Sequence, residues 1–215
     1  MITDNSYFEK GTLYIPNNKD VSARPEGTPS KQSEIDFFIE TYERELLLNA
    51  FGTTIYNELV IAYSDLDNAS QKWQDLINGV DYTINGKLHK WEGLKGFNKQ
   101  SLIANYIFCA YLRNDEQIYT TVGVVKSTAE NAVLSDATPK FIKSWNSFIE
   151  KYQSTTNGSP EIIVNGSGAV GLDYYGNKSS IVSLYQFLTD ANELDATAFP
   201  NFEFRFYQPY NSFGI

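Results

Sequence analysis

The feature that most constrains the fold is a helical spacing of apolar residues that begins near Ser33. In this first segment large apolar residues recur three and four positions apart, which places them on one face of a helix. They are Ile35, Phe38, Ile39, Tyr42, Leu46, Leu47 and Ala50. Gly52 follows as a helix stop, and Thr53 or Thr54 can begin the next helix. Apolar faces of this length need a partner surface, so the spacing predicts a mainly α fold.

The same spacing recurs in later segments and predicts about five helices in a bundle-like core. A short helix covers 69–77, and the most apolar helix, at 97–113, is expected at the centre of the core. Thr138-Pro139 forms a typical helix start, with a capping threonine before proline at the first helical position. A final helix is predicted to begin at Ser180.

Two β-hairpins are predicted beside the helices. Asn85-Gly86 lies between two short alternating runs, which is the strongest short-range hairpin signal and places one hairpin near 80–92. The second is predicted at 161–176. Between the hairpins, the irregular stretch "YTTVGVVKSTAENAVLSDA" is interpreted as a short strand followed by a loop.

The two ends of the chain lack helical spacing and bound a helical domain at 33–200. Residues 1–32 contain three prolines and predict an extended N-terminal arm. Its apolar residues suggest that it lies against another surface: Tyr7, Phe8, Leu13, Tyr14 and Ile15. At 201–215 a C-terminal tail opens with strict alternation from Phe202 to Tyr207, which is typical of a strand.

A glycine-rich stretch at 161–180 contains G-x-G-x-x-G at Gly166, Gly168 and Gly171, directly after a β-branched run. In a dinucleotide-binding fold, a helix that binds pyrophosphate follows such a turn. Here Gly176-Asn177 would break that helix, and the chain before it is helical where strands and helices should alternate. The stretch is therefore interpreted as a hairpin that projects towards a neighbour.

Composition argues against several classes of function. The net charge of −9 disfavours a protein that neutralises nucleic-acid phosphates with clustered Lys and Arg. The start "MITDNSYFEKG" lacks the basic and apolar regions of a signal peptide, and no apolar run approaches the ~18 residues of a membrane helix. A soluble protein made in a host cytoplasm, with no membrane contact, is expected.

Residues for catalysis or metal binding are scarce. His89 and Cys109 are the single histidine and cysteine, so they cannot form a zinc site by themselves. His89 is expected to be a solvated hairpin residue among lysines, and Cys109 to pack as a small apolar residue. Two carboxylate pairs are interpreted as solvated, Glu40/Glu43 and Asp65/Asp67. No catalytic residue, cofactor or metal is predicted, and the protein is not expected to be an enzyme.

Several successive stretches resemble one family of virion proteins. They are "LLLNAFGTTIYNEL", "KWQDLINGVDYTINGKLHKWEGLKG", "NYIFCAYL", "TTVGVVKSTAENA", "FIKSWNSF" and the closing "NSFGI". Together, over roughly 33–215, they are similar to head-to-tail connector, or adaptor, proteins of tailed phages that infect Bacteroidetes, including crAss-like phages.

The resemblance implies a structural function in the virion neck. Such proteins form a homo-oligomeric ring, commonly of twelve copies, beneath the portal protein and next to other neck or tail rings. DNA passes through the lumen without specific binding. The alternatives are a secreted or surface carbohydrate-binding protein, suggested by abundant Tyr, Trp, Asn and Gly, and the less favoured nucleotide-binding enzyme.

Residues for contacts between copies are predicted in two places, the glycine-rich hairpin and the C-terminal tail. An isolated hairpin is marginal in water, and exposed tail aromatics are costly to leave there. The alternative for the tail is that it closes the core of its own subunit. The candidate interface residues are Ile162, Ile163, Val164, Tyr174, Tyr175, Phe202, Phe204, Phe206, Tyr207, Tyr210, Phe213 and Ile215.

Overall fold

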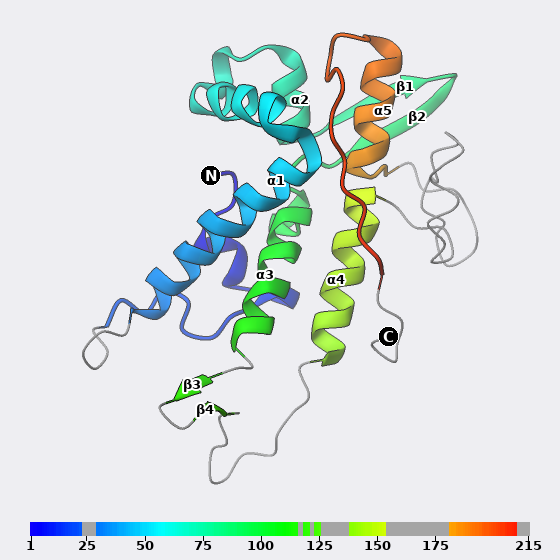
Figure 1. The fold of residues 1–215 in the computed structure, drawn as a ribbon. Helices are drawn as coiled ribbons and strands as arrows, with labels where there is room; N and C mark the ends of the chain where they lie inside the picture. The colour runs from blue at the N-terminus through cyan, green and yellow to red at the C-terminus, as the bar shows by residue number, and fades with distance from the viewer. Residues whose placement is uncertain (23–28, 116–117, 121–122, 126–137, 154–180, 210–215) are drawn as a thin grey trace.

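The mainly α fold is confirmed by a computed structural model (Figure 1), which describes residues 1–22, 29–115, 118–120, 123–125, 138–153 and 181–209. Its five α-helices are α1 (Lys31–Ser64), α2 (Gln71–Asn78), α3 (Leu102–Asp115), α4 (Thr138–Gln153) and α5 (Leu184–Leu194). The strands are β1 (Val80–Ile84), β2 (Lys87–Trp91), β3 (Ile118–Thr120) and β4 (Gly123–Val125). Short 3-10 turns are η1 (Asn5–Phe8), η2 (Gly11–Leu13), η3 (Leu66–Asn68) and η4 (Phe97–Lys99).

The core is a layer of three helices in which α3 lies between α1 and α4 (Figure 1). This central position was predicted from the apolar sequence of α3. Most of its side chains are buried: Leu102, Ile103, Ala104, Tyr106, Ile107, Phe108, Cys109 and Tyr111. The Ser101 hydroxyl accepts from the N–H of Ala104 at 3.0 Å and caps the start of the helix. The predicted start of α4 at Thr138 is confirmed.

A kink at Gly52 divides α1 into two helical halves. Gly52 has φ 72° and ψ 172°, a backbone conformation that only glycine adopts without strain. The prediction that one helix stops at Gly52 and another begins at once is therefore correct in backbone terms. The kink turns the second half of α1 towards α2, where Trp73, Leu76 and Ile77 are buried.

The hairpin predicted near 80–92 is confirmed. β1 and β2 pair antiparallel with Ile84 opposite Lys87, which leaves a two-residue turn. Asn85 and Gly86 occupy that turn with φ of 50° and 72°, as a type I′ turn requires. β3 and β4 form a second antiparallel pair of backbone segments. The hairpin predicted at 161–176 lies outside the described residues.

The N-terminal segment is not an extended arm. Residues 1–22 include η1 and η2, and bury Ile2, Tyr7, Phe8, Leu13 and Ile15 in the common core. Tyr14 alone among the five predicted contact residues is exposed. η1 packs against α1 and η2 against α3, and burial of these large apolar side chains stabilises the folded segment.

The start of α5 also differs from its prediction. Ser183 caps the helix by accepting from the N–H of Gln186 at 3.2 Å, so the helix begins later than Ser180. Just before the helix, Ile181 lies beside Lys90 of β2 in a parallel bridge, and the N–H of Val182 donates to the carbonyl of Lys90 at 2.9 Å. This bond joins the start of α5 to β2.

Candidate interface at the C-terminal tail

Residues 202–209 of the C-terminal tail run as an extended segment across α1, α4 and α5 (Figure 1). The alternating sequence predicts a strand here. Among the described residues this segment pairs with no other strand, and its partners are helices. The extended backbone is thus as expected, but it is held by different contacts from those of a sheet.

Three phenylalanines share one face of the segment, as the alternation predicts. The rings of Phe202, Phe204 and Phe206 lie 6.1, 5.1 and 5.2 Å from the ring of Tyr185 on α5. Phe204 also stacks on Tyr152 of α4 at 4.3 Å. The phenylalanine face is therefore attached to its own chain, although Phe206 remains 44% exposed.

Tyr207 lies on the opposite face and completes an aromatic cluster between α3 and α4. Its ring is 5.9 Å from Tyr106, 5.8 Å from Trp145, 5.4 Å from Phe148 and 5.5 Å from Tyr152. Burial raises the pKa of Tyr207, so its hydroxyl stays neutral and can take part in hydrogen bonds.

The backbone of the tail is bound by polar groups of α1 and α4. The Arg205 N–H donates to the carbonyl of Asn49 at 2.9 Å. Asn49 lies in the last turn before the kink, where helix carbonyls lack an intrahelical partner. Gln153 accepts from the Tyr207 N–H and donates to its carbonyl, both at 2.8 Å. The indole N–H of Trp145 donates to the carbonyl of Gln208 at 2.8 Å.

These contacts place the first half of the tail in its own subunit. Phe202, Phe204 and Tyr207 pack on the core, which agrees with the alternative that the tail closes its own chain. Eight candidate interface residues lie outside the described residues: Ile162, Ile163, Val164, Tyr174, Tyr175, Tyr210, Phe213 and Ile215. Contact of any candidate residue with another copy stays a prediction.

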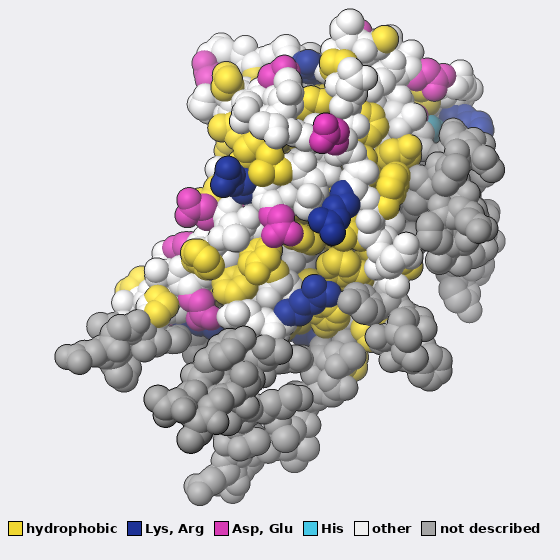
Figure 2. Space-filling view, in the orientation of Figure 1, with side chains coloured by type: hydrophobic (Ala, Val, Ile, Leu, Met, Phe, Trp, Pro, Cys, Tyr) yellow, Lys and Arg dark blue, Asp and Glu magenta, His cyan; other side chains and the backbone are white. Residues whose placement is uncertain are grey.

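The surface elsewhere carries large apolar side chains. Phe37 and Ile61 on α1 are 63% and 72% exposed, and Leu88 on β2 and Phe97 are 61% and 68% exposed. Figure 2 shows hydrophobic side chains gathered along α1 and along the tail. Sequence periodicity could not single these residues out, because it assigns apolar residues to the core.

His89 is not a solvated residue, so that prediction is wrong. Its Nδ1 lies 2.7 Å from Oδ2 of the buried Asp190, and the Tyr82 hydroxyl donates to the same oxygen at 2.6 Å. Gln186 contributes a further hydrogen bond to the Asp190 carboxylate. The network joins both hairpin strands to α5 and gives the buried His89 and Asp190 side chains hydrogen-bond partners.

Glu43 is also buried, contrary to the interpretation of Glu40/Glu43 as a solvated pair. Its carboxylate oxygens accept from the N–H groups of Ile2 and Thr3 at 2.7 and 2.8 Å. Burial raises the pKa of Glu43, and these two hydrogen bonds oppose the increase. The side chain fastens the N-terminal segment to α1.

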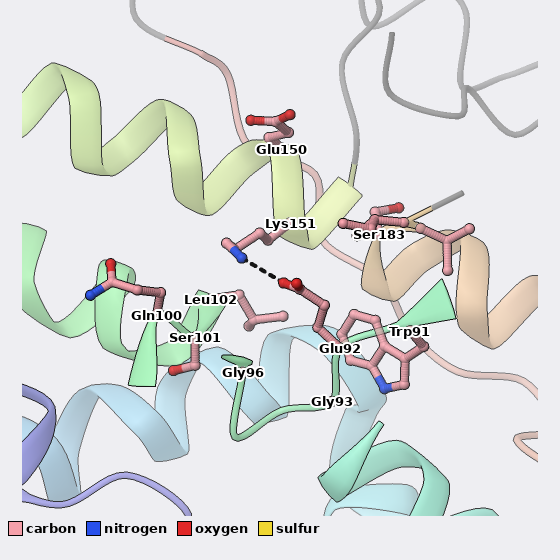
Figure 3. Close-up of a pocket in the computed structure, with 12 residues that line it drawn as sticks. Trp91, Glu92, Gly93, Gly96, Gln100, Ser101, Leu102, Glu150, Lys151 and Ser183 are labelled. Atoms are coloured by element: carbon pink, nitrogen blue, oxygen red, sulfur yellow. Dashed lines mark hydrogen bonds and ion pairs between the residues drawn. The ribbon is translucent and has the colours of Figure 1, made fainter. Parts of the chain in front are cut away.

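A pocket of about 240 Å³ lies between β2, the start of α3, the end of α4 and the start of α5 (Figure 3). Lys151 and Glu92 form an ion pair of 2.9 Å across it. Ser101 and Ser183 also line the pocket, but both hydroxyls cap helices. No base, nucleophile and oxyanion donor converge here among the described residues.

A cluster of metal-ligating side chains and a membrane-spanning helix are both absent from the described part of the chain. No three His, Cys, Asp or Glu side chains come together there as a metal site would require. None of the helices it contains is long and apolar enough to cross a bilayer. Cys109 is buried as expected, and burial raises its pKa to about 12.

Comparison of the chain with protein-family models, curated proteins and solved structures found no match.

Proposed function

We propose that the protein is a structural subunit of a head-to-tail connector ring in a phage virion. Copies would form a ring beneath the portal protein and contact the next neck or tail ring. The lumen would let DNA pass without specific binding, for which the net charge of −9 is suited because like charges repel. The resemblance of the sequence to Bacteroidetes phage adaptors motivates this assignment.

The observation that supports the proposal is the exposure of large apolar side chains on separate elements. Phe37 and Ile61 lie on α1, whereas Leu88 lies on the β1–β2 hairpin. A ring requires two different surfaces on each subunit, because each copy contacts its neighbours head to tail. Phe37 and Ile61 lie on either side of the kink at Gly52, so exposed apolar side chains are present on more than one face that a neighbouring copy could cover.

Assembly of the purified full-length chain tests this proposal. Negative-stain images and native mass spectrometry should show closed rings, alone or after addition of the portal protein of the same virus. The variants Phe37→Ser and Ile61→Ser should reduce ring formation while leaving the melting temperature nearly unchanged, because both side chains are already largely in water.

Glu58→Ser is a matched control on the same helix, since its exposed side chain is polar from the outset. Rings that form equally well in all variants would mean that the α1 surface is not the contact. A chain that stays monomeric with portal protein present, and that binds glycans instead, would favour the carbohydrate-binding alternative.

A further inference from the structure

Among residues 202–207 of the tail, only Arg205 and Tyr207 bind the helices through their backbone, and the carbonyl of the following Gln208 accepts from Trp145. The N–H groups of Arg205 and Tyr207 donate to Asn49 and Gln153. The N–H groups and carbonyls of Phe204 and Phe206 make no hydrogen bond to the part of the chain that the structure describes. In an extended segment, the backbone groups of successive residues point to opposite edges. With respect to the described residues, one edge of segment 202–207 is thus bound and the other is open.

The sequence along this open edge is self-complementary. Residues 202–206 read Phe-Glu-Phe-Arg-Phe, so the pattern about Phe204 has a phenylalanine at each end and opposite charges between. If two such segments lie antiparallel about Phe204, each Glu203 faces an Arg205 of the other copy. Phe202 then faces Phe206, and Phe204 faces its own equivalent.

In this register, the residues that form backbone hydrogen bonds between the two copies are the same residues whose backbone groups lie on the open edge. In an antiparallel pair, residues that exchange both backbone bonds alternate with residues that exchange none. The open edge presents the backbone groups of Phe204 and Phe206. In this register Phe204 exchanges backbone hydrogen bonds with Phe204 of the other copy, and Phe206 exchanges them with Phe202 of the other copy. Glu203 and Arg205 fall in the non-bonded pairs, where opposing side chains are closest.

We propose that two copies of the chain join through residues 202–206, as antiparallel strands about a two-fold axis at Phe204. Each tail stays on its own helices and offers its open edge to the other, as in strand addition. Glu203 and Arg205 are both exposed and available for the two ion pairs. The contact is isologous, so it is separate from the proposed ring and does not rest on it.

Charge reversal in the full-length chain tests the register. In a dimer of Arg205→Glu, a glutamate faces a glutamate at both 203–205 pairs. In a dimer of Glu203→Arg, an arginine faces an arginine at both pairs. Each variant alone should dimerise about tenfold or more weakly than the natural chain, because attractive cross-strand pairs become repulsive. An equal mixture of the two variants restores both opposite-charge pairs and should form heterodimers.

Sedimentation velocity over a concentration series gives the dimerisation constants, and native mass spectrometry identifies the heterodimer. Lys87→Glu and Asp81→Arg change the net charge by the same amounts at exposed positions of the β1–β2 hairpin and should have no effect. A natural chain that is monomeric at every concentration overturns the proposal, as does a mixture without heterodimers. Dimerisation that both charge reversals leave unchanged would overturn this contact, and rings that still form in those variants would leave the proposed function standing.

Discussion

The side-chain amide of Gln153 brackets the backbone of Tyr207. Its Nε2 donates to the Tyr207 carbonyl and its Oε1 accepts from the Tyr207 N–H, each at 2.8 Å. One side chain at the end of α4 thus imitates the two bonds that a neighbouring strand would make. Tyr207 is held in register by this pair, and its ring completes the aromatic cluster of α3 and α4.

Gln153→Ala should loosen the tail. It leaves two partly buried backbone groups of Tyr207 without partners, so the free energy of unfolding should fall by about 1–3 kcal/mol. Trypsin should then cleave faster after Arg205. Urea denaturation and timed digestion provide the measurements. Gln208→Ala is the control, because only the carbonyl of Gln208 is used, by Trp145. Equal behaviour of the two variants would show that the bracket contributes nothing.

Gly52→Ala should be destabilising because a side chain is strained at φ 72° and ψ 172°. The expected loss is about 1–3 kcal/mol in the free energy of unfolding. The added Cβ would also lie 3.3 Å from Cδ of Glu203 and disturb the tail. Gly86→Asn is a useful comparison, because asparagine tolerates a type I′ turn and no atom lies within 4 Å. In thermal unfolding, the melting temperature should fall clearly for Gly52→Ala and only slightly for Gly86→Asn.

Glu43 should make stability fall as pH rises. Burial raises its pKa above the ordinary value of 4.5, so the folded protein holds this proton more tightly than the unfolded chain does. The resulting stabilisation is complete below 4.5 and is lost as pH increases through the raised pKa. Relative to Glu43→Gln, the natural chain should therefore lose stability over this window.

Urea denaturation at several pH values measures the difference, and Glu40→Gln, exposed on the same helix, should show no such trend. A natural chain that gains stability over Glu43→Gln with rising pH would contradict the prediction.

Cys109 should resist thiol reagents in the folded protein. Burial raises its pKa to about 12, so almost no thiolate exists near neutral pH. Alkylation at mildly alkaline pH should be about a hundredfold or more slower than in urea. Mass spectrometry of samples quenched at intervals would follow it. Rapid labelling without denaturant would mean that α3 and α4 separate readily.

The helices could be predicted from the sequence because their signals are local. The spacing around Ile103 and Phe148 reports a buried helix face without knowledge of its partner. Asn85-Gly86 likewise specifies its own turn. The kink at Gly52 could also be predicted from the sequence, whereas the contact between the tail and Gly52 could not.

The polar contacts could not be predicted because their partners are distant in the chain. His89 contacts Asp190, which is 101 residues away. Glu43 accepts hydrogen bonds from backbone groups that lie 41 and 40 residues before it. Nothing near either residue marks it as buried. The tail shows the same limit, since its alternation predicts an extended backbone but not that helices would bind it.

The side-chain amide of Asn49 donates to the hydroxyl of Tyr207, 158 residues later in the chain, at 3.1 Å. This long separation has a consequence for synthesis. Before residues 202–208 have been translated, α1, α3 and α4 can assemble with Tyr106, Trp145 and Phe148 partly open to water. A nascent or truncated chain without residues 202–208 would present this uncovered aromatic surface to chaperones and proteases. Only chains translated past Gln208 can cover it, so chains that stop earlier would be distinguishable from those that contain the tail.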